Sequence, residues 1–454
     1  MKKIKRQESC GVFGINLSNQ SCFDKLKKGA FHLQHRGPRG TGFGVVIDRE
    51  IVVEKKIMLA KPFFETKIRN NPELLESQIG IAHVALLELQ PVIIRQSTLG
   101  HPIALALNGM IVNREEVLNV LKDSSFTIGS DAELFIKLIA QEENYLKGIE
   151  NIFRYVKGAF SIVILTTEEV FAIRDPWGFK PLIIGRSSEG CAVASESVAL
   201  EKSGMEIIRD VKPGEFVKIE PNGFRTLYQA EVKKRAVCTF EFAYFSKTSS
   251  CIDGIPVVIA RHNMGKNLAK NDGIKADIVS TFPLSGMSHA DGYHLESKIP
   301  YINIFEYNRY SDRSWTSPTR ESSDEIAEEK LTINEAVIKN KNIILIDDSI
   351  FEAVQIGDWI HKLKEKGAKE IHIRISTPPV IANCPYDFPN RNNKKLITFD
   401  HNQEDIRKKI RADTLSFNTS EDFAAAIISA QRNTKTPLKP EDLCMGCFTG
   451  KFPI

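Results

Sequence analysis

Several features that would reveal a location or a partner are missing from this 454-residue sequence. No window approaches the ~18 consecutive apolar residues of a membrane-spanning helix, and the polar, lysine-rich start lacks the apolar stretch of a secretion signal. The 61 basic and 57 acidic residues are spread along the chain, so no basic run indicates nucleic acid or an anionic membrane. We also find no internal repeat and no low-complexity segment. These absences predict a cytoplasmic protein with no membrane and no nucleic-acid partner.

Length and cysteine content narrow the class further. A chain of 454 residues with 42% hydrophobic residues is too long for one core, and we expect two domains. Without a secretion signal, the eight cysteines are expected to be thiols, catalytic groups or metal ligands rather than disulfides. Cys444 and Cys447 have C-x-x-C spacing, which suits either one metal centre or a redox pair.

The stretch from Glu8 to Ile15 places a cysteine at the start of an apolar, strand-like run. If the leader before it is removed, Cys10 becomes the N-terminal residue and carries both a thiol and a free α-amine. An α-amine has an ordinary pKa near ~8 and can act as the base for its own side chain. The residues alone leave two interpretations open, a catalytic nucleophile and a buried structural cysteine.

The first half of the chain is predicted to be rich in strands. Residues 23–34 have helical spacing, and strand patterns occur at 40–44, 79–85, 102–107, 158–165, 170–173 and 182–185. Asn108 and Gly109 follow one of these strands and form a pair that ordinarily signals a tight hairpin turn. Ser130 or Asp131 is suited to cap the helix that continues to Gln141. The pattern predicts an α+β domain.

From Cys238 onward, helix-like segments alternate with isolated apolar strands, as in a parallel α/β sheet. The most apolar strand, from Asn342, ends in Asp347 and Asp348. Buried parallel strands place such acids at the carboxyl edge of the sheet, where ligands bind in open α/β folds. Paired acids at a strand end are also found simply solvated, so a ligand site is one of two interpretations.

Taken together, these residues resemble the glutamine phosphoribosylpyrophosphate (PRPP) amidotransferase family in its iron–sulfur, propeptide-bearing form. The similarity runs from Cys10 to Pro453 through motifs at 10–14, 33–37, 174–176, 194–200, 210–215, 240–245, 308–310, 347–350, 412–417 and 447–451. It implies a propeptide at 1–9 and an N-terminal-nucleophile glutaminase domain at 10–237, folded as a four-layer αββα sandwich. It further implies a type I phosphoribosyltransferase domain at 238–454, a doubly wound parallel sheet with a cluster-binding tail.

The resemblance implies roles in a glutaminase site. Cys10 would attack the amide carbon of glutamine, while Asn108 and the amide of Gly109 would hold the oxyanion. Arg36 would support the loop that carries the nucleophile. Asp131 would pair with the α-ammonium of the substrate.

The resemblance also implies a second active site and a metal centre. Ser285 lies where the family has its pyrophosphate loop, and Asp347 and Asp348 would bind ribose hydroxyls or help to place Mg²⁺. Family members are commonly homo-oligomers controlled by purine nucleotides. Four thiolates suit a 4Fe-4S cluster, and all four family ligands are retained, as Cys238, Cys384, Cys444 and Cys447.

Both active sites also depart from the family. Ala85 stands where the family has the arginine that binds the α-carboxylate of glutamine, and Arg95 is a nearby residue that could compensate. The family phosphate loop, Arg-Gly-Thr-Thr, is replaced by Glu-Ala-Val-Gln at 352–355, and its basic pyrophosphate loop by an acidic stretch at 321–330. Acidic side chains repel a dianionic phosphate, so we expect PRPP binding to be lost or strongly weakened.

Three functions follow from this combination. The first is an amidotransferase that passes ammonia from glutamine to PRPP and makes phosphoribosylamine. The second is an amidohydrolase or amidotransferase with another donor or acceptor, and the third is a non-catalytic iron–sulfur paralogue with a scaffold or regulatory role. Retention of Cys10, Asn108 and Asp131 favours the first two, whereas loss of the phosphate loop favours the last two.

Overall fold

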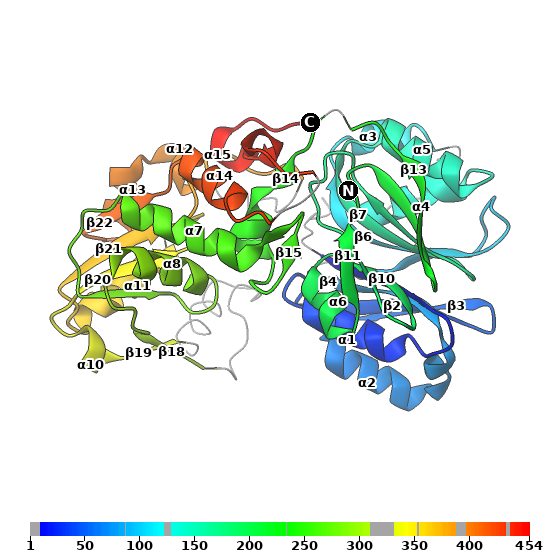
Figure 1. The fold of residues 1–454 in the computed structure, drawn as a ribbon, viewed down its shortest axis with the longest axis horizontal. Helices are drawn as coiled ribbons and strands as arrows, with labels where there is room; N and C mark the ends of the chain where they lie inside the picture. The colour runs from blue at the N-terminus through cyan, green and yellow to red at the C-terminus, as the bar shows by residue number, and fades with distance from the viewer. Residues whose placement is uncertain are drawn as a thin grey trace.

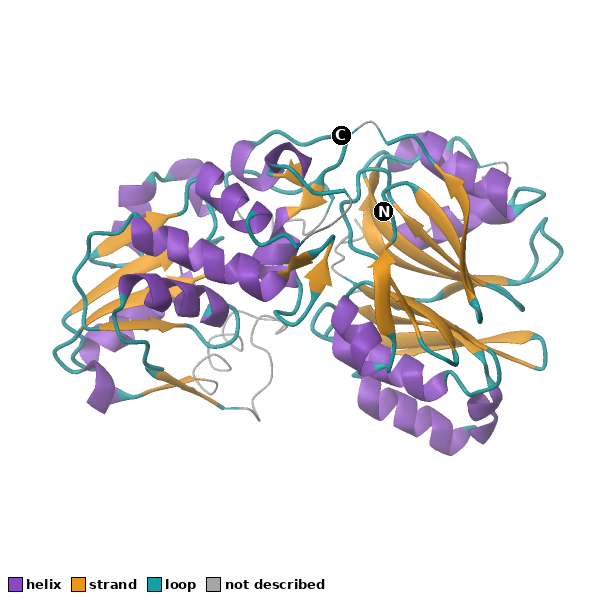
Figure 2. Ribbon diagram, in the orientation of Figure 1, coloured by secondary structure: helices purple, strands orange, loops and turns teal. Residues whose placement is uncertain are grey.

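The computed structural model describes residues 10–86, 88–121, 129–232, 234–308, 331–351, 354–386, 396–432 and 436–454. Figure 1 shows two lobes side by side, the N-terminal one at right and the C-terminal one at left. The N-terminal lobe contains two sheets that face each other with helices outside them (Figure 2). The C-terminal lobe contains a sheet with helices on both faces.

The first sheet of the N-terminal lobe has the strand order β11-β9-β10-β1-β4-β2-β3, and each strand is antiparallel to its neighbours. Its strands are β1 Gly11–Leu17, β2 Gly40–Ile47, β3 Glu50–Lys56, β4 Ile79–Ala85, β9 Ile183–Arg186, β10 Gly190–Ala194 and β11 Glu206–Asp210. The helices α1 Phe23–Leu33, α2 Ala60–Asn70 and α6 Ser197–Lys202 lie on its outer side.

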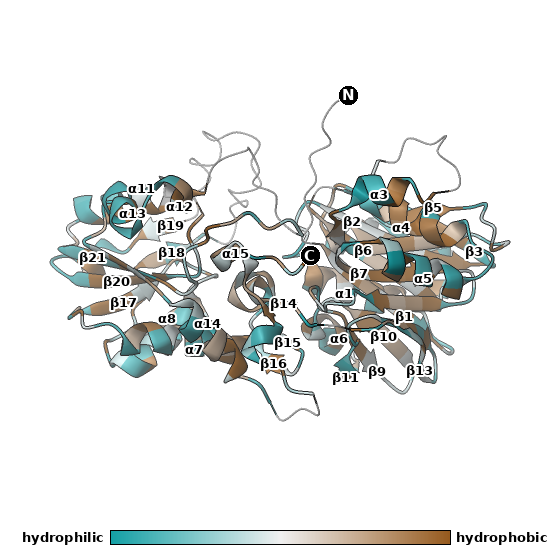
Figure 3. Cartoon of the chain, turned by 90° about the horizontal axis from the view of Figure 1, so that it is seen from above, coloured by the Kyte–Doolittle hydropathy of each residue, from teal (hydrophilic) through white to brown (hydrophobic). Residues whose placement is uncertain are grey.

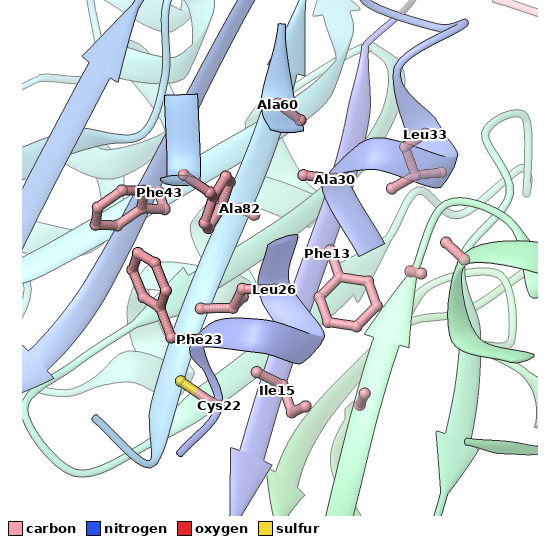
Figure 4. Packing of buried hydrophobic residues seen from close by; sticks show 14 of the residues in the cluster. Phe13, Ile15, Cys22, Phe23, Leu26, Ala30, Leu33, Phe43, Ala60 and Ala82 are labelled. Carbon is pink, nitrogen blue, oxygen red and sulfur yellow. The ribbon is translucent and has the colours of Figure 1, made fainter. Parts of the chain in front are cut away.

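The side chains of strand β1 pack into two different cores, one on each face of the first sheet. Phe13 and Ile15 point toward α1 and pack in a core with Leu26 (Figure 4). Val12 belongs instead to the core between the sheets, because successive side chains of a strand point to opposite faces. Gly14 also faces inward, where an added Cβ would lie 2.4 Å from Val163 of the other sheet. Both faces of β1 are therefore buried, one under helices and the other under a second sheet.

The second sheet has the order β13-β12-β8-β7-β6-β5. Its strands are β5 Val92–Ile94, β6 Ile103–Ile111, β7 Gly158–Leu165, β8 Val170–Arg174, β12 Glu215–Glu220 and β13 Gly223–Gln229, covered by the helices α3 Arg114–Leu118, α4 Asp131–Ala140 and α5 Tyr145–Tyr155. In β6, Ile103 and Leu105 pack toward the helices, whereas Ala104 and Ala106 face the first sheet. This confirms the predicted αββα sandwich.

Asn108 and Gly109 do not form the hairpin turn that their sequence suggests. They lie inside β6, and each is paired with a residue of β7, Ser161 and Phe160 respectively. Gly109 has φ +153, and a Cβ there would lie 2.1 Å from the carbonyl oxygen of Ala159. The glycine is thus required by a close approach within the sheet rather than by a turn.

The C-terminal lobe contains the parallel sheet β17-β20-β21-β22, formed by β17 Ile278–Thr281, β20 Asn342–Asp347, β21 Glu370–Ile375 and β22 Thr414–Phe417. On the other side of β17, Val279 forms a parallel bridge with Tyr301. The chain therefore runs from β17 to one side first and then to the other. This reversal makes a topological switch point between β17 and β20, and it confirms the doubly wound arrangement.

Helices cover both faces of this sheet. In β20, Ile344 and Ile346 pack with α7 Val257–Lys270 and α8 Met287–Ser297, and Ile343 and Leu345 pack with α11 Val354–Glu365 and α13 Gln403–Lys409. Figure 3 shows brown hydrophobic stretches on strands such as β17 and teal residues on α11 and α13. A strand that is buried on both faces reads as a continuous apolar run, which is how β20 appears in the sequence.

Short elements complete the described chain. Those near the junction of the lobes are β14 Val237–Cys238, the π-helix η2 Glu241–Phe245, β15 Cys251–Ile252, β16 Ile255–Pro256, α14 Ser420–Ile428, η4 Pro440–Asp442, β23 Leu443–Cys444 and α15 Gly446–Thr449. The remaining ones are η1 Pro72–Glu76, β18 Phe305–Tyr307, β19 Leu331–Ile333, α10 Glu335–Ile338 and α12 Ile397–Asp400. Strand β14 pairs in parallel with β23, so the C-terminal tail returns to the start of the second lobe.

Candidate active site

Cys10 lies directly before β1 and is completely buried. The register of β1 against β4 pairs Gly11 with Val84, which places Ala85 opposite Cys10 one residue further along. The backbone N–H of Cys10 donates to Oδ1 of Asn108 at 3.3 Å. The sheets thus bring together a cysteine and an asparagine that are 98 residues apart in the chain.

Asn108 and Gly109 place two N–H donors near Cys10. The Nδ2 of Asn108 is buried and has no hydrogen-bond partner within the described part of the chain. On the same strand, the N–H groups of Leu107 and Ile111 donate to Gln90 Oε1 at 2.7 Å and to Asp131 Oδ2 at 2.9 Å. Because alternate N–H groups leave a strand on the same edge, that of Gly109 lies between them. A buried, unpaired donor is costly unless a ligand oxygen accepts from it.

Arg36 holds the backbone of Cys10 in place. Its Nε donates to the carbonyl oxygen of Cys10 at 3.1 Å, and its Nη atoms donate to Glu196 at 2.8 Å and to Glu241 at 2.6 Å. Burial acts against the charge of Arg36, but Glu241 and Glu196 outweigh it and raise the pKa of the guanidinium. Burial likewise opposes ionisation of Glu196, yet His35 and Arg36 hold the pKa of its carboxyl below the ordinary value. Since Glu241 belongs to η2, this ion-pair network crosses the junction between the lobes.

Asp131 forms an ion pair rather than an open site. Its Oδ1 lies 2.5 Å from Nη1 of Arg114, and each of the two side chains is 11% exposed. The residue begins α4, whose N-terminus is capped by Ser130 as the sequence predicts, with Ser130 Oγ accepting from the N–H of Glu133. The sequence did not predict Arg114 as the partner of Asp131, because the two residues are 17 positions apart and lie on different helices.

The acids Asp347 and Asp348 lie at the carboxyl end of β20, as predicted, and this end is beside the switch point of the second sheet. Ser285 Oγ donates to Asp347 Oδ1 at 3.4 Å, and Ser349 Oγ donates to Asp348 Oδ2 at 2.6 Å. Burial raises the pKa of both carboxyls, and the charge of Asp348 raises that of Asp347 further. Arg261, buried in α7, lowers the pKa of Asp348 in part. The structure therefore brings together the three predicted residues of this site.

The end of β21 supports the acidic loop. The N–H groups of Ser376 and Thr377 donate to the carbonyl oxygens of Asp347 and Asp348 at 2.9 and 3.0 Å. The hydroxyls of Ser376 and Thr377 are buried and have no partner among the residues that the structure describes. The predicted acidic replacement of the phosphate loop is not seen here, because residues 352–353 and the side chains of 354–355 lie outside the described residues, as does 321–330.

The four predicted cysteine ligands lie in two close pairs, Cys238 with Cys444 and Cys384 with Cys447, where the C-terminal tail crosses the junction. Cys238 of β14 and Cys444 of β23 are register partners. Contact with Cys384, then burial, raises the pKa of Cys447 well above its ordinary value, and burial raises that of Cys444 to about 12. Such thiols are stabilised as thiolates only by a positive partner. As they stand, no three His, Cys, Asp or Glu side chains in the described ranges form a group that could hold a metal ion.

Comparisons with known proteins cover almost the whole chain. A family model described as a glutamine amidotransferase domain matches residues 87–202. The amidophosphoribosyltransferases of Methanocaldococcus jannaschii and Bacillus subtilis are each 33% identical, over 98% of this chain and 97% and 94% of their own lengths. The chain belongs to the amidophosphoribosyltransferase family. A solved structure of the B. subtilis glutamine PRPP amidotransferase, complexed with ADP and GMP, has a TM-score of 0.86 at 32% identity and covers 98% of this chain and 97% of that one.

Family membership agrees with the resemblance found in the sequence. The structure adds residues near the site that the sequence prediction did not name. Glu196 and Glu241 lie inside two motifs that carry the amidophosphoribosyltransferase resemblance, at 194–200 and 240–245, which is the one sequence signal that marks them. His83, buried in β4, contacts the carbonyl oxygen of Leu107 at 3.2 Å, and burial lowers its pKa to about 3. Within the described ranges, every helix is too short or too polar to cross a lipid bilayer.

Proposed function

We propose that this chain is a glutamine amidotransferase of the amidophosphoribosyltransferase type, whose nucleophile is Cys10 after removal of residues 1–9. The Nδ2 of buried Asn108 supports the proposal most directly, because it lies next to the backbone of Cys10 and has no hydrogen-bond partner among the described residues. After cleavage, the nitrogen that now donates to Asn108 becomes the α-amine of Cys10, so the same contact would hold the base beside the thiol.

The glutaminase reaction then uses this chain's residues as follows. The α-amine of Cys10 takes the thiol proton, and the sulfur attacks the amide carbon of glutamine. Asn108 Nδ2 and the N–H of Gly109 donate to the oxyanion. The C–N bond breaks, ammonia leaves with a proton returned from the α-ammonium, and water hydrolyses the resulting thioester to glutamate. Arg36 positions Cys10 through the backbone carbonyl, without touching the substrate.

We place the acceptor at the carboxyl edge of the second sheet, in a domain that spans 238–454. Asp347 and Asp348 would bind the hydroxyls of a ribose ring, with Ser285 alongside. Mg²⁺ fits the donor set, since carboxylate and hydroxyl oxygens are its usual ligands, and it would neutralise the pyrophosphate of PRPP. Glu352 in place of the family arginine weakens binding of the 5-phosphate, so we expect a high KM for PRPP.

A second candidate function has a different acceptor. The acidic residues at 321–330 and Glu352 favour an acceptor with less negative charge than PRPP, because like charges repel in a partly buried site. The glutaminase half of the reaction is common to both candidates. They differ only in what consumes the ammonia.

We further propose that Cys238, Cys384, Cys444 and Cys447 bind a 4Fe-4S cluster. The four thiols lie within mutual electrostatic reach, and the cluster supplies the positive iron that thiolates need. It would tie the tail to the start of the second domain, so that stability depends on iron. Iron and sulfide analysis of anaerobically purified protein tests this, with Cys384→Ser expected to lose both and Cys22→Ser, outside the proposed set, to keep them. We also expect a cytoplasmic homo-oligomer.

One preparation tests the main proposal. The intact mass of anaerobically purified protein reports whether residues 1–9 are removed, and the same sample is assayed for glutamate release and PRPP consumption. Removal with both activities supports PRPP as the acceptor. Removal with glutamate release alone favours the second candidate. A retained leader without either activity would contradict both and support a non-catalytic iron–sulfur paralogue.

A further inference from the structure

The amide site lacks a cation at the position where the family resemblance implies one. Ala85 lies opposite Cys10 in the strand register and is 1% exposed, so its methyl group cannot bind a carboxylate. A free amino acid donor presents an α-carboxylate and an α-ammonium together. Binding both requires an anion and a cation in the same part of the site.

Arg114 and Asp131 are such a pair. Arg114 begins α3, three residues after the end of β6, and its Nη1 lies 2.5 Å from Oδ1 of Asp131. The other oxygen of Asp131 accepts from the N–H of Ile111 at 2.9 Å, which fixes the pair to β6. The N–H of Gly109 leaves the same strand edge about 7 Å away, which is comparable to a glutamine side chain plus a hydrogen bond.

On the basis of the glutaminase function above, we propose that Arg114 binds the α-carboxylate of the amide donor and replaces the arginine missing at Ala85. The guanidinium donates two parallel N–H hydrogen bonds to the carboxylate, while Asp131 binds the α-ammonium. The donor's two charges then extend the ion pair that is already present. The 11% exposure of both side chains keeps the pair shielded yet reachable.

Two other arginines are less suitable, one beside Ala85 and one beyond the far end of β5. Arg39 donates its backbone N–H to the carbonyl oxygen of Ala85 at 3.1 Å, yet its side chain is exposed. Arg95 follows β5 and is also exposed. An exposed cation binds a carboxylate weakly because water screens it. These two residues therefore serve as matched controls.

The test uses three amide donors that differ in whether they have the α-carboxylate, the α-ammonium or both. L-Glutamine has both head-group charges, 4-aminobutanamide lacks the carboxylate, and 4-carbamoylbutanoate lacks the ammonium. Ammonia release is measured with each donor for the mature wild type, Arg114→Ala, Arg114→Lys, Arg39→Ala and Arg95→Ala. We expect Arg114→Ala to lower kcat/KM for the two carboxylate-bearing donors by about 30-fold or more. The loss on 4-aminobutanamide should be much smaller, because that donor has no carboxylate for Arg114 to bind and uses only Asp131.

The lysine variant and the controls decide the outcome. Arg114→Lys should recover part of the loss, since it keeps the charge without the two-pronged geometry. Equal losses on all three donors would show a structural role and refute the proposal. A selective loss in Arg39→Ala or Arg95→Ala, with Arg114→Ala unaffected, would refute it in favour of the other arginine.

Failure of the underlying function gives a different result. If the mature wild type releases no ammonia from glutamine, the glutaminase function itself is refuted, and the role of Arg114 with it. If the wild type is active on glutamine and Arg114→Ala shows no selectivity between donors, only the role of Arg114 is refuted. Thermal unfolding of each variant identifies any that fails to fold, and Arg114→Lys then carries the comparison.

Discussion

Around Cys10, the guanidinium of Arg36 lies between the carboxylates of Glu196 and Glu241, whereas at the end of β20 the carboxylates of Asp347 and Asp348 lie beside each other. Opposite charges hold the first arrangement without any ligand. The second contains like charges, and burial raises both pKa values, so it is relieved by a proton or a bound cation. The fold alone therefore holds the surroundings of Cys10 in place, whereas the end of β20 is stabilised by a proton or cation that binds there.

A substitution at Cys10 should disable one region and leave the other active. Cys10→Ala should lower glutamine-dependent glutamate release by about a thousand-fold or more, because the nucleophile is removed. Product formation from added ammonia should be unaffected, since the proposed acceptor site is in the other lobe. Steady-state assays with glutamine and with ammonium chloride measure the two. Cys251→Ala is the control, and loss of both activities would contradict the separation.

The ion-pair network predicts a large effect on stability. Arg36→Met leaves Glu196 and Glu241 as buried carboxylates without their cation, which should cost about 3–5 kcal/mol. The urea midpoint of the transition that reports the N-terminal lobe measures this. Arg39→Met is the control, because Arg39 is a close neighbour with an exposed side chain. Similar midpoints for both variants would show that the network is not stabilising.

The oxyanion donor predicts a change in rate with little change in binding. Asn108→Ala should lower kcat by about 10²–10³-fold and leave KM nearly unchanged, because the hydrogen bond forms only when the oxyanion develops. Steady-state kinetics with glutamine test this in the mature protein. A raised KM with an unchanged kcat would instead assign Asn108 to binding of the ground state.

The acid pair predicts a smaller effect that depends on pH. Burial and Asp348 raise the pKa of Asp347 above its ordinary value of 3.8, so the folded state binds the proton more tightly than the unfolded state does. Stability should therefore fall as the pH rises from the ordinary value toward the raised one. Asp347→Asn removes this loss, so its urea midpoint should exceed that of the wild type by more at pH 8 than at pH 5. A constant difference between the two pH values would argue against the raised pKa.

Much of the fold follows from local patterns. The predicted strands at 79–85 and 158–165 match β4 and β7. Strands are recognised from alternating or continuous apolar residues, and both patterns can be read within a short segment of the sequence. The placement of Asp347 and Asp348 at a sheet edge was also predictable, since acids that follow a buried parallel strand have few other positions.

The partners of the site residues were not predictable in the same way. The hairpin expected at Asn108 and Gly109 is wrong, because pairing with β7 outweighs the turn preference of the dipeptide. The sequence around Arg114 has no pattern that indicates a role in the site. Its proposed role depends on the ion pair with Asp131, which lies on a different helix.

The amino-acid sequence alone predicts most of the strands and helices, the family and the position of Cys10 before a strand. The folded chain was needed to show that the backbone of Cys10 contacts Asn108, that Arg36 reaches Glu241 across 205 residues, and that Arg114 pairs with Asp131. The physical reason is that local patterns depend on neighbours along the chain, whereas buried charges and unpaired donors acquire their roles from groups that folding brings beside them.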